Sequence, residues 1–334
     1  EDMLETEVDA VVIATPMQLH VPQVLKALEA GKHVLSEVTA GVTLQELGWL
    51  KQWVEKYDDL TYMMAENYCY IPQNRIIKNM VEEGLLGEVY FGEGEYIHEI
   101  KDLATRSLHE PGETAEAAAP TTTWRRFWQL GRRGNFYPTH SLGPVLQWFE
   151  GEKIKSVSCQ GTGWHTAPEF TQEDTSLTLV KLESGKLIKL RLDCISERPH
   201  NLTYYALQGT RGCYEAPRGL GDEHKIWLAD MDKNAAAAEW RPLSQFEDYL
   251  PPRYRKATEA QKEAGHQGGD FFIVKDFVDA VRGRQEVPVD VYDACEWTAV
   301  GLLSEISIQH QGKPVLMPDF RGETPVAEQG IEFL

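Results

Sequence analysis

Two titratable rings, Tyr137 and His140, lie three positions apart in the stretch GNFYPTHSLGPV, on either side of Pro138. The proline biases Tyr137 toward an extended backbone, so the two rings belong to a stiff segment. A phenol and an imidazole at this spacing can transfer protons at a reacting carbon. The alternative is a turn that leads into a helix and has no chemical role.

The residues that follow predict a helix, because their apolar side chains recur at helical spacing. Thr139 or Ser141 is expected to cap it, and Pro144 is expected in the first turn, where the missing N–H costs nothing. His140 would then lie at the helix N-terminus, where the positive end of the helix dipole disfavours imidazolium. This position favours the neutral ring, which is the form that accepts a proton.

An arginine cluster is a second candidate. The stretch WRRFWQLGRRGN interleaves arginines with Trp124 and Trp128 in an otherwise acidic chain. One interpretation is a clamp on cofactor phosphates or on a sugar, in which Trp124 and Arg125 contact the substrate. The other is that the arginines form ion pairs with nearby acidic residues.

Composition limits the function classes. The 334 residues carry 33 Lys+Arg and 52 Asp+Glu, a formal net charge of −19, so general binding to nucleic acid or to an anionic membrane is not expected. The five cysteines are scattered and include no Cys-x-x-Cys pair. They predict reduced, buried thiols and a cytoplasmic location. No metal site is predicted, because the histidines and carboxylates lack diagnostic ligand spacing.

Alternating strands and helices would position these groups. VDAVVIATP, KHVLSE and LTYMMAEN are predicted as buried strands, and the helix before the third begins at Thr43 with a capping box completed by Glu46. Short connections of this kind indicate a parallel sheet with right-handed crossovers. Later stretches are rich in strands, with a hairpin at Ser184–Gly185, and predict an open antiparallel sheet. Residues 222–269 are expected to form a long surface loop or lid, before a late helix capped by Asp270.

The stretch IATPMQLHVPQVLKALEAGKHVLSE resembles the second half of the Rossmann domain in the Gfo/Idh/MocA family of nicotinamide-dependent sugar oxidoreductases. NRIIKNMVEEGLLGEV resembles the helix that links the two domains of that family. The resemblance implies NAD or NADP as cofactor, contacted by Thr15, Pro16 and His20 after the first strand and by Glu37 and Val38 after the second. For His20 a structural role is the alternative.

The fold class is therefore expected to be α/β. A partial Rossmann domain, parallel and doubly wound, is predicted for residues 1–68. An α+β domain with a large open antiparallel sheet is predicted for residues 69–334, with late helices over 270–311 packing back on the first domain.

Two features depart from the family pattern. The Gly-x-Gly-x-x-Gly turn that seats the cofactor pyrophosphate is absent, so we expect either that it lies upstream in a longer chain or that dinucleotide binding is lost. The family's Glu-Lys-Pro appears here as Glu37-Val38-Thr39. Valine cannot titrate, so another group must take the proton that the lysine carries in an ordinary sugar dehydrogenase.

A narrower resemblance supplies such groups. MMAENYCY, GEGEYIH and GNFYPTHSLGPV are similar to motifs of the NAD-dependent glycosidases of this superfamily, the α-N-acetylgalactosaminidase type, with Ser141 where that pattern has glycine. The resemblance implies transient oxidation at C3 of a sugar, removal of the C2 proton and elimination at C1. It assigns proton transfer to Tyr137, His140 and Tyr96. It places His98 in the site as well, and for Tyr96 and His98 a structural role is the alternative. Glu66 and Asn67 follow the third strand, at the end where such folds bind ligands, and are expected to contact the nicotinamide or the sugar. His266, in the glycine turn GHQGGD, is expected either to close over the substrate or to be an ordinary loop histidine.

Two other functions stay open: a conventional sugar or cyclitol dehydrogenase, and a non-catalytic sugar-binding relative. A homo-oligomer is also expected, because an open sheet buries apolar residues on both faces only when it is paired. The residues expected at that interface are Leu177, Leu179, Leu187 and Leu190.

Overall fold

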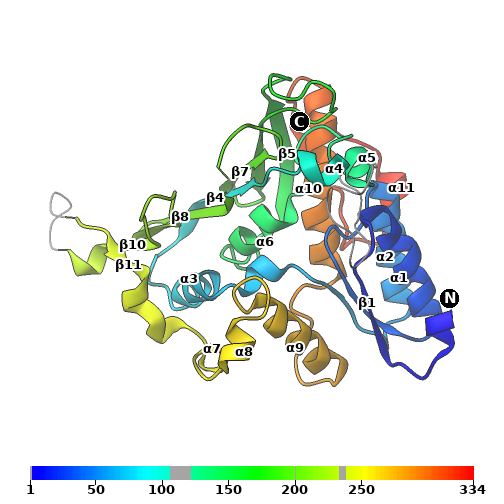
Figure 1. The fold of residues 1–334 in the computed structure, drawn as a ribbon, viewed down its shortest axis with the longest axis horizontal. Helices are drawn as coiled ribbons and strands as arrows, with labels where there is room; N and C mark the ends of the chain where they lie inside the picture. Colours follow the sequence, from blue (N-terminus) through cyan, green and yellow to red (C-terminus); the bar gives the residue numbers. More distant parts are fainter. Residues whose placement is uncertain (1, 106–121, 200, 233–237) are drawn as a thin grey trace, which may run out of the picture.

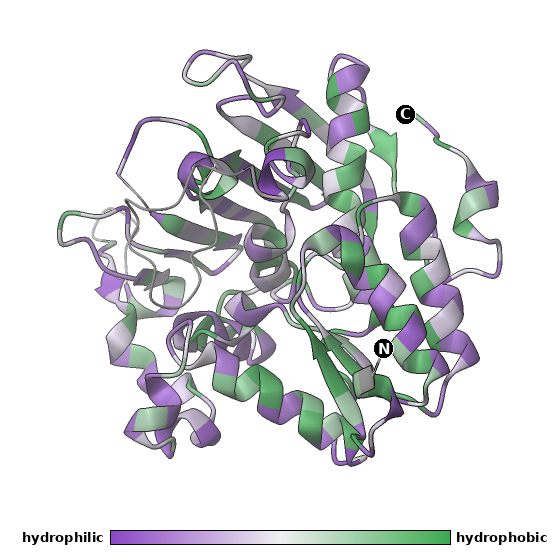
Figure 2. Ribbon diagram, turned by 45° about the vertical axis from the view of Figure 1, so that its right-hand side comes forward, coloured by the Kyte–Doolittle hydropathy of each residue, from purple (hydrophilic) through white to green (hydrophobic). Residues whose placement is uncertain are grey.

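The computed structural model describes residues 2–105, 122–199, 201–232 and 238–334, and the strands named within these ranges form two sheets (Figure 1). The smaller sheet is parallel, with the order β1-β2-β3, as the alternating pattern predicts. Its elements are β1 (Ala10–Ile13), α1 (His20–Glu29), β2 (His33–Ser36), α2 (Leu44–Lys56) and β3 (Tyr62–Met64), with 3-10 turns η1 (Asp2–Glu5) and η2 (Met17–Leu19). The predicted capping box of Thr43 and Glu46 begins α2. Buried hydrophobic residues dominate β2 and β3 (Figure 2), as expected for strands covered on both faces.

The second sheet has nine strands among the described residues, in the order β11-β10-β9-β8-β4-β7-β6-β5-β12. They are β4 (Val89–Ile97), β5 (Ile154–Gly161), β6 (Ser176–Leu182), β7 (Leu187–Asp193), β8 (Leu202–Gly209), β9 (Gly212–Glu215), β10 (Lys225–Leu228), β11 (Arg241–Pro242) and β12 (Val315–Leu316). Every neighbouring pair is antiparallel except β4 and β7, which are parallel. The predicted hairpin joins β6 to β7, and Gly185 adopts the left-handed φ of 93° in its turn.

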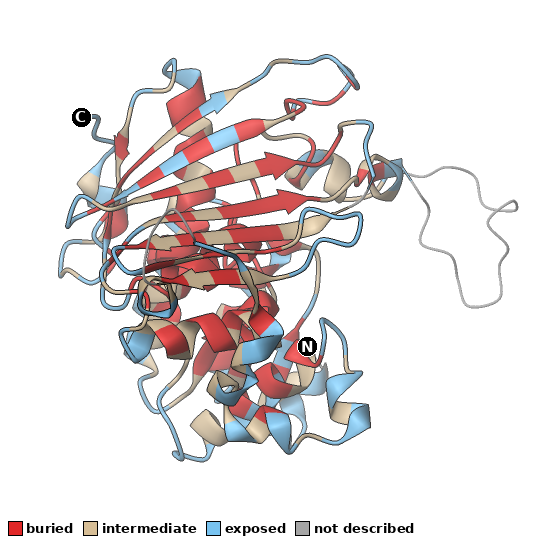
Figure 3. Ribbon diagram, turned by 90° about the vertical axis from the view of Figure 1, so that its left-hand side faces the viewer, coloured by how far each residue is buried: buried red, intermediate tan, exposed pale blue. Residues whose placement is uncertain are grey.

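One face of this sheet is open on β6 and β7, where buried and less buried residues alternate (Figure 3). Leu177 and Leu179 are exposed and Leu187 is half-buried. Leu190 was expected on the same face, but it is buried on the inner one, opposite the buried Thr178. The alternation of side chains along a strand explains the difference, because Leu187 and Leu190 are an odd number of residues apart.

Helix α6 (Thr139–Leu146) packs on the inner face of the sheet, against β4 and β8. It can lie close because β4 carries glycines at the crossing. A Cβ added to Gly94 would lie 1.9 Å from the carbonyl oxygen of Ser141, and one added to Gly92 would lie 2.5 Å from Cγ1 of Val145. The glycines of GEGEYIH therefore set the distance between the sheet and the helix that carries His140.

The start of α6 differs from the prediction. Pro138 is the N-cap residue, and neither Thr139 nor Ser141 caps the helix with its side chain. The hydroxyl of Ser141 instead donates to the carbonyl oxygen of Pro138 at 3.0 Å. Thr139 and Ser141 lie inside the helix, past the cap position, so neither side chain is placed to accept from the amides of the first turn.

Pro144 lies inside α6 and not in its first turn as predicted. It has no N–H to donate to the carbonyl oxygen of His140, four residues earlier. The hydroxyl of Tyr205, on β8, donates to that oxygen at 2.6 Å. The proline therefore leaves an acceptor that the sheet satisfies, which ties α6 to β8 at His140.

Residues 222–269 are not the expected loop or lid where the structure describes them. They form edge strands β10 and β11 and the short helices η4 (Ala229–Met231), η6 (Leu243–Tyr249), α7 (Pro252–Arg255) and α8 (Glu259–Lys262). Leu243 and Tyr254 anchor the segment in the core, where they are 2% and 3% exposed. The Tyr249 carbonyl accepts a hydrogen bond from Asn79 of α3 (Pro72–Glu82).

The late helices are α9 (Gly269–Val281) and α10 (Val291–Gln309). The N-cap of α9 is Gly268, so the predicted cap, Asp270, lies inside the first turn. Helix α10 packs against α2 and contacts β3 of the small sheet and β5 of the large one, so it touches both sheets (Figure 1). The remaining elements are η3 (Asn67–Tyr70), α4 (Lys101–Thr105), α5 (Arg125–Trp128) and α11 (Val326–Gln329). None of the described helices is long and apolar enough to cross a membrane.

Candidate active site

A carboxylate–histidine pair formed by Glu66 and His140 lies at the centre of the site. Glu66 follows β3 and caps η3 by accepting from the amide of Tyr68 at 3.2 Å. Its two carboxylate oxygens lie 2.8 and 3.1 Å from Nδ1 of His140, and its side chain is fully buried. Nδ1 carries the proton in this pair because a carboxylate only accepts. Nε2 of His140 is therefore the nitrogen that can take a proton.

Tyrosine rings surround His140. The ring centres of Tyr68, Tyr137 and Tyr96 lie 4.5, 4.8 and 5.2 Å from the imidazole centre. Burial raises the pKa of all three hydroxyls. They are neutral near pH 7 and act as hydrogen-bond donors more readily than as bases. The hydroxyl of Tyr96 lies 2.6 Å from Nδ1 of His98, so four of the predicted site residues form one cluster.

The residues predicted to contact the cofactor lie at the carboxyl ends of the parallel strands. Thr15 and Pro16 follow β1, and Glu37 and Val38 follow β2. Burial raises the pKa of Glu37, while the nearby His140 lowers it by a smaller amount. In open parallel sheets this edge is where ligands bind.

His20 is tied to the backbone on both sides of its ring. Nδ1 lies 2.7 Å from the carbonyl oxygen of Thr39, and Nε2 lies 2.8 Å from that of Thr15. Burial lowers the pKa of His20, against the effect of these two backbone contacts. Both ring nitrogens are engaged, so the side chain supports the two loops and has no free nitrogen for a ligand.

The side chain of Asn67 has a polar atom that a bound nicotinamide would satisfy. Its Oδ1 is buried and has no hydrogen-bond partner among the residues that the structure describes. Its Nδ2 lies 3.1 Å from Nδ1 of His266 and 3.3 Å from Oδ1 of Asp270. A carboxamide or hydroxyl donor at the end of β3 would satisfy the orphaned oxygen. The predicted residues Asn67 and His266 are thus brought together, beside Glu66.

The arginine cluster is divided. Arg132 pairs with Glu305 at 2.7 Å, and Arg133 pairs with the buried Glu173, which supports the ion-pair interpretation for these two. Arg125 stacks on Trp124, with 4.6 Å between the guanidinium carbon and the ring centre. Burial raises the pKa of Tyr96 and of Tyr137, and the charge of Arg125 opposes that rise. The Trp124–Arg125 pair is therefore near the cluster.

Three residues of the site were not assigned from the sequence. Tyr68 lies within the quoted ENYCY motif, and only its position after β3 could have singled it out. Asp270 was taken for a helix cap, but its carboxylate contacts His266 at 2.9 Å. Tyr205 carries no local signal, because its contact with α6 comes from the pairing of β8 with β4.

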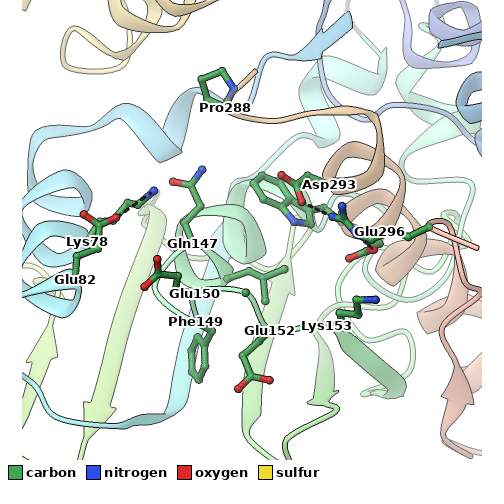
Figure 4. A pocket seen from close by; sticks show the side chains of 14 residues that line it. Lys78, Glu82, Gln147, Phe149, Glu150, Glu152, Lys153, Pro288, Asp293 and Glu296 are labelled. Carbon is green, nitrogen blue, oxygen red and sulfur yellow. Dashed lines mark hydrogen bonds and ion pairs between the residues drawn. The ribbon is translucent and has the colours of Figure 1, made fainter. Parts of the chain in front are cut away.

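A separate cavity of about 440 Å³ lies among α3, the segment after α6 and α10 (Figure 4). None of the predicted site residues lines it. Its walls include Lys78, Glu150, Asp293 and Glu296. No group of three or more His, Cys, Asp or Glu side chains within the described ranges is placed to hold a metal ion.

Two family models match the chain. The C-terminal domain of glycosyl hydrolase 109 matches residues 70–324, and the NAD-binding Rossmann fold of the oxidoreductase family matches residues 1–65. A glycosyl hydrolase family 109 protein of Shewanella putrefaciens is 30% identical over 345 residues, covering 94% of this chain and 70% of the relative. An alpha-N-acetylgalactosaminidase of Shewanella oneidensis has the same identity and coverage.

Solved structures share the fold. An oxidoreductase domain protein from Kribbella flavida superposes with a TM-score of 0.73 at 19% identity, covering 95% of this chain and 83% of that one. Levoglucosan dehydrogenase in complex with NADH superposes with a TM-score of 0.70 at 18% identity, covering 95% and 82%. At this identity the likeness concerns the fold alone.

Proposed function

The chain belongs to the glycosyl hydrolase 109 family, and from that membership we propose that it cleaves a glycoside by transient oxidation at C3 and elimination across C1 and C2, without net redox change. The observation that carries the proposal is the buried Glu66–His140 pair within a shell of neutral tyrosines. Val38 stands where the related dehydrogenases have a proton-carrying lysine. The groups proposed to transfer protons therefore lie around His140 and not at residue 38.

The cofactor is NAD, which supplies a reversible hydride acceptor when bound. Thr15, Pro16, Glu37 and Val38 would hold it at the carboxyl ends of β1 and β2, with Asn67 toward the nicotinamide. This scheme differs from that of glycosidases that use two carboxylates. A ketone at C3 acidifies the hydrogen on C2, so the protein needs a base there and donors for the C3 oxygen.

His140 is the proposed base. Its Nε2 takes the C2 proton, and the charge that develops on the ring is balanced by the Glu66 carboxylate on Nδ1. Tyr137 and Tyr96 are proposed to donate hydrogen bonds to the C3 oxygen, since burial keeps both hydroxyls protonated. His98, Trp124 and Arg125 are proposed to contact the sugar. The Shewanella oneidensis relative is named an alpha-N-acetylgalactosaminidase, so we propose α-linked N-acetylgalactosaminides as the first substrates to assay.

The test is hydrolysis in D₂O with a catalytic amount of NAD. We expect deuterium at C2 of the released sugar and no accumulation of reduced-nicotinamide absorbance. Stoichiometric reduction of NAD without C2 label would indicate a dehydrogenase. Neither signal, from protein that binds no NAD, would indicate a sugar-binding protein.

Variants of the cluster extend the test. His140→Ala should lower turnover by about 10²–10⁴-fold, as loss of a positioned base does, and Tyr137→Phe by about 10²–10³-fold, as loss of a positioned donor does. His310→Ala, an exposed histidine at the end of α10, is the control and should keep full turnover. Unchanged kinetics in both site variants would return residues 137–140 to a purely structural role.

We further propose that the open face of the large sheet joins copies of the chain into a homo-oligomer. The support is the exposure of Leu177 and Leu179, which are 46% and 43% exposed on adjacent outward positions of β6. Apolar residues repeated along an open strand are typical of a protein interface.

A further inference from the structure

The loop GHQGGD, residues 265–270, has an unusual backbone that brings one histidine to the edge of the site. His266, Gln267 and Gly268 adopt left-handed φ values of 53°, 57° and 87°. For a residue other than glycine this conformation costs about 1–3 kcal/mol and recurs at functional sites. A Cβ on Gly265 would lie 2.1 Å from Oδ2 of Asp270. The loop is thus shaped around the contact between His266 and Asp270.

Asp270 fixes the state of the His266 ring. Both carboxylate oxygens lie close to Nδ1, at 2.9 and 3.1 Å. Nδ1 is therefore the protonated nitrogen, and the amide of Asn67, 3.1 Å from Nδ1, donates to Oδ1 of Asp270 at 3.3 Å and not to the ring. The described residues offer Nε2 of His266 no hydrogen-bond partner. The site thus contains a second carboxylate–histidine pair whose free nitrogen can exchange a proton with a ligand.

Tyr68 contacts the histidines of both pairs. The ring centre of Tyr68 is 4.5 Å from that of His140 and 5.5 Å from that of His266. The Glu66–His140 pair is buried, whereas 42% of the His266 side chain is exposed. Glu37 and Tyr68 both sense the charge of Asp270, although burial is the larger cause of their raised pKa values. The second pair therefore lies on the solvent side of the same site.

We propose that His266, oriented by Asp270, is the acid and base for the group that leaves C1 and for the water that replaces it. The inference rests on the proposed function. Nε2 of His266 first takes up a proton from solvent, and as the bond between C1 and the aglycone oxygen breaks it gives that proton to the oxygen. Water then adds at C1 and gives a proton to Nε2, which restores the starting state.

A second group is required because His140 holds the C2 proton during the elimination. The aglycone must also depart toward solvent, and water must arrive from it. Of the two histidines, His266 is exposed to solvent and meets this requirement, whereas His140 is buried. A proton-transfer role for His266 would also explain why His266 and Gln267, which are not glycines, have a left-handed backbone conformation.

The test compares two leaving groups on one sugar, in the protein loaded with NAD. His266→Gln should lower hydrolysis of methyl α-N-acetylgalactosaminide by about 10²–10⁴-fold. First-turnover release of 2,4-dinitrophenolate from the corresponding glycoside should slow less than about 10-fold, because the phenolate departs without a proton and before water adds. Deuterium exchange at C2 should persist in the variant. His310→Gln is the matched control and should leave all three measurements unchanged.

The outcomes separate the two proposals. Absence of C2 label in the unmodified protein, with NAD reduced stoichiometrically, overturns the proposed function. Normal C2 exchange with equal losses on the two glycosides, or with no loss on either, overturns only the role of His266.

A second measurement does not depend on turnover. Imidazole ¹⁵N chemical shifts report which ring nitrogen is protonated, and we expect protonated Nδ1 at His266. Asp270→Asn should shift the proton toward Nε2, because the amide can donate to Nδ1. A His266 ring protonated on Nε2 alone at neutral pH in the unmodified protein would contradict the proposed orientation.

Discussion

At the scale of single residues, the position of His140 depends on two neighbours that exchange no proton with the substrate. Glu66 fixes the side chain through Nδ1, and Tyr205 fixes the backbone through the carbonyl oxygen that Pro144 leaves without a donor. Side-chain and backbone anchors together hold the ring in one place, which a proton-transfer group requires.

The contact with Tyr205 predicts a rescue experiment. Tyr205→Phe should lower the free energy of unfolding by about 1–3 kcal/mol, because the His140 carbonyl would be buried without a partner. In the double variant Tyr205→Phe, Pro144→Ala, the new amide at residue 144 can donate to that oxygen within the helix. Urea denaturation should therefore show a smaller loss in the double variant. If Pro144→Ala fails to reduce the loss, the hydroxyl stabilises the protein in another way.

At the scale of elements, the crossing of α6 and β4 determines where the site forms. Gly94→Ala should destabilise the protein by about 1–3 kcal/mol, because the new methyl group would meet the backbone oxygen of Ser141. It should also lower turnover, since relief requires α6 to move. Gly48→Ala in α2 is a suitable control: its Cβ would lie 3.3 Å from Cβ of Val326, and alanine favours the helix. Equal free energies of unfolding for the two variants would mean that the close approach of Gly94 to Ser141 does not hold α6 in place.

A carboxyl group of helix α10, on Asp293, predicts that the stability of the fold depends on pH. Burial, with a contribution from Asp290, raises the pKa of Asp293 to about 7, and Arg321 acts in the opposite direction. An unfolded aspartate titrates near pH 4. Between these values the folded chain keeps a proton that the unfolded chain has lost, so Asp293 makes stability fall as pH rises from about 4 to 7.

Asp293→Asn should remove this trend. The free energy of unfolding of the variant minus that of the unmodified protein should be larger at pH 8 than at pH 5, as measured by urea denaturation at both values. Asp248→Asn is the control for the loss of one negative charge, because the Asp248 side chain is fully exposed. A difference independent of pH would show that Asp293 acts through its hydrogen bonds and not through its charge.

Elements with a local signal were predictable from the sequence. The capping box at Thr43 and the hairpin at Gly185 depend on residues within a few positions of each other, and the structure contains both. Failures occurred where distant segments decide the outcome. Residues 222–269 were predicted as a loop because they are charged, alanine-rich and interrupted by prolines, and only pairing with β9 makes β10 part of a sheet.

The same distinction holds for the site. Motif similarity singled out Tyr137 and His140, which the structure brings together. The partnership of Glu66 with His140 joins residues 74 positions apart, and no spacing rule reaches that far. Asp270 was misread because aspartate near a helix start is usually a cap. Its true neighbour depends on the left-handed backbone at His266.

At the scale of the whole molecule, the proposed oligomer makes a direct prediction. Leu177→Glu combined with Leu179→Glu places charges on the open face, where desolvation on association would be costly. We expect light scattering to show a multimer for the unmodified protein at micromolar concentration and a smaller species for the variant. Leu220→Glu is the control, because Leu220 is exposed but lies outside the sheet strands. A monodisperse monomer before any substitution would contradict the proposal.

The central position of β4 affects how the chain folds during its synthesis. Its partners on both sides come much later in synthesis: Gly92 pairs with Ile188 on one edge and with Leu207 on the other. The nearer partner is 188 − 92 = 96 residues away, which a ribosome adds in about 5–20 s. During that interval a strand containing Tyr90, Phe91 and Tyr96 has no sheet to join. Glu93 and Glu95, which meet Lys189 and Arg218 in the finished fold, place two negative charges on this strand. We expect these charges to disfavour pairing between nascent chains until the partner strands are made.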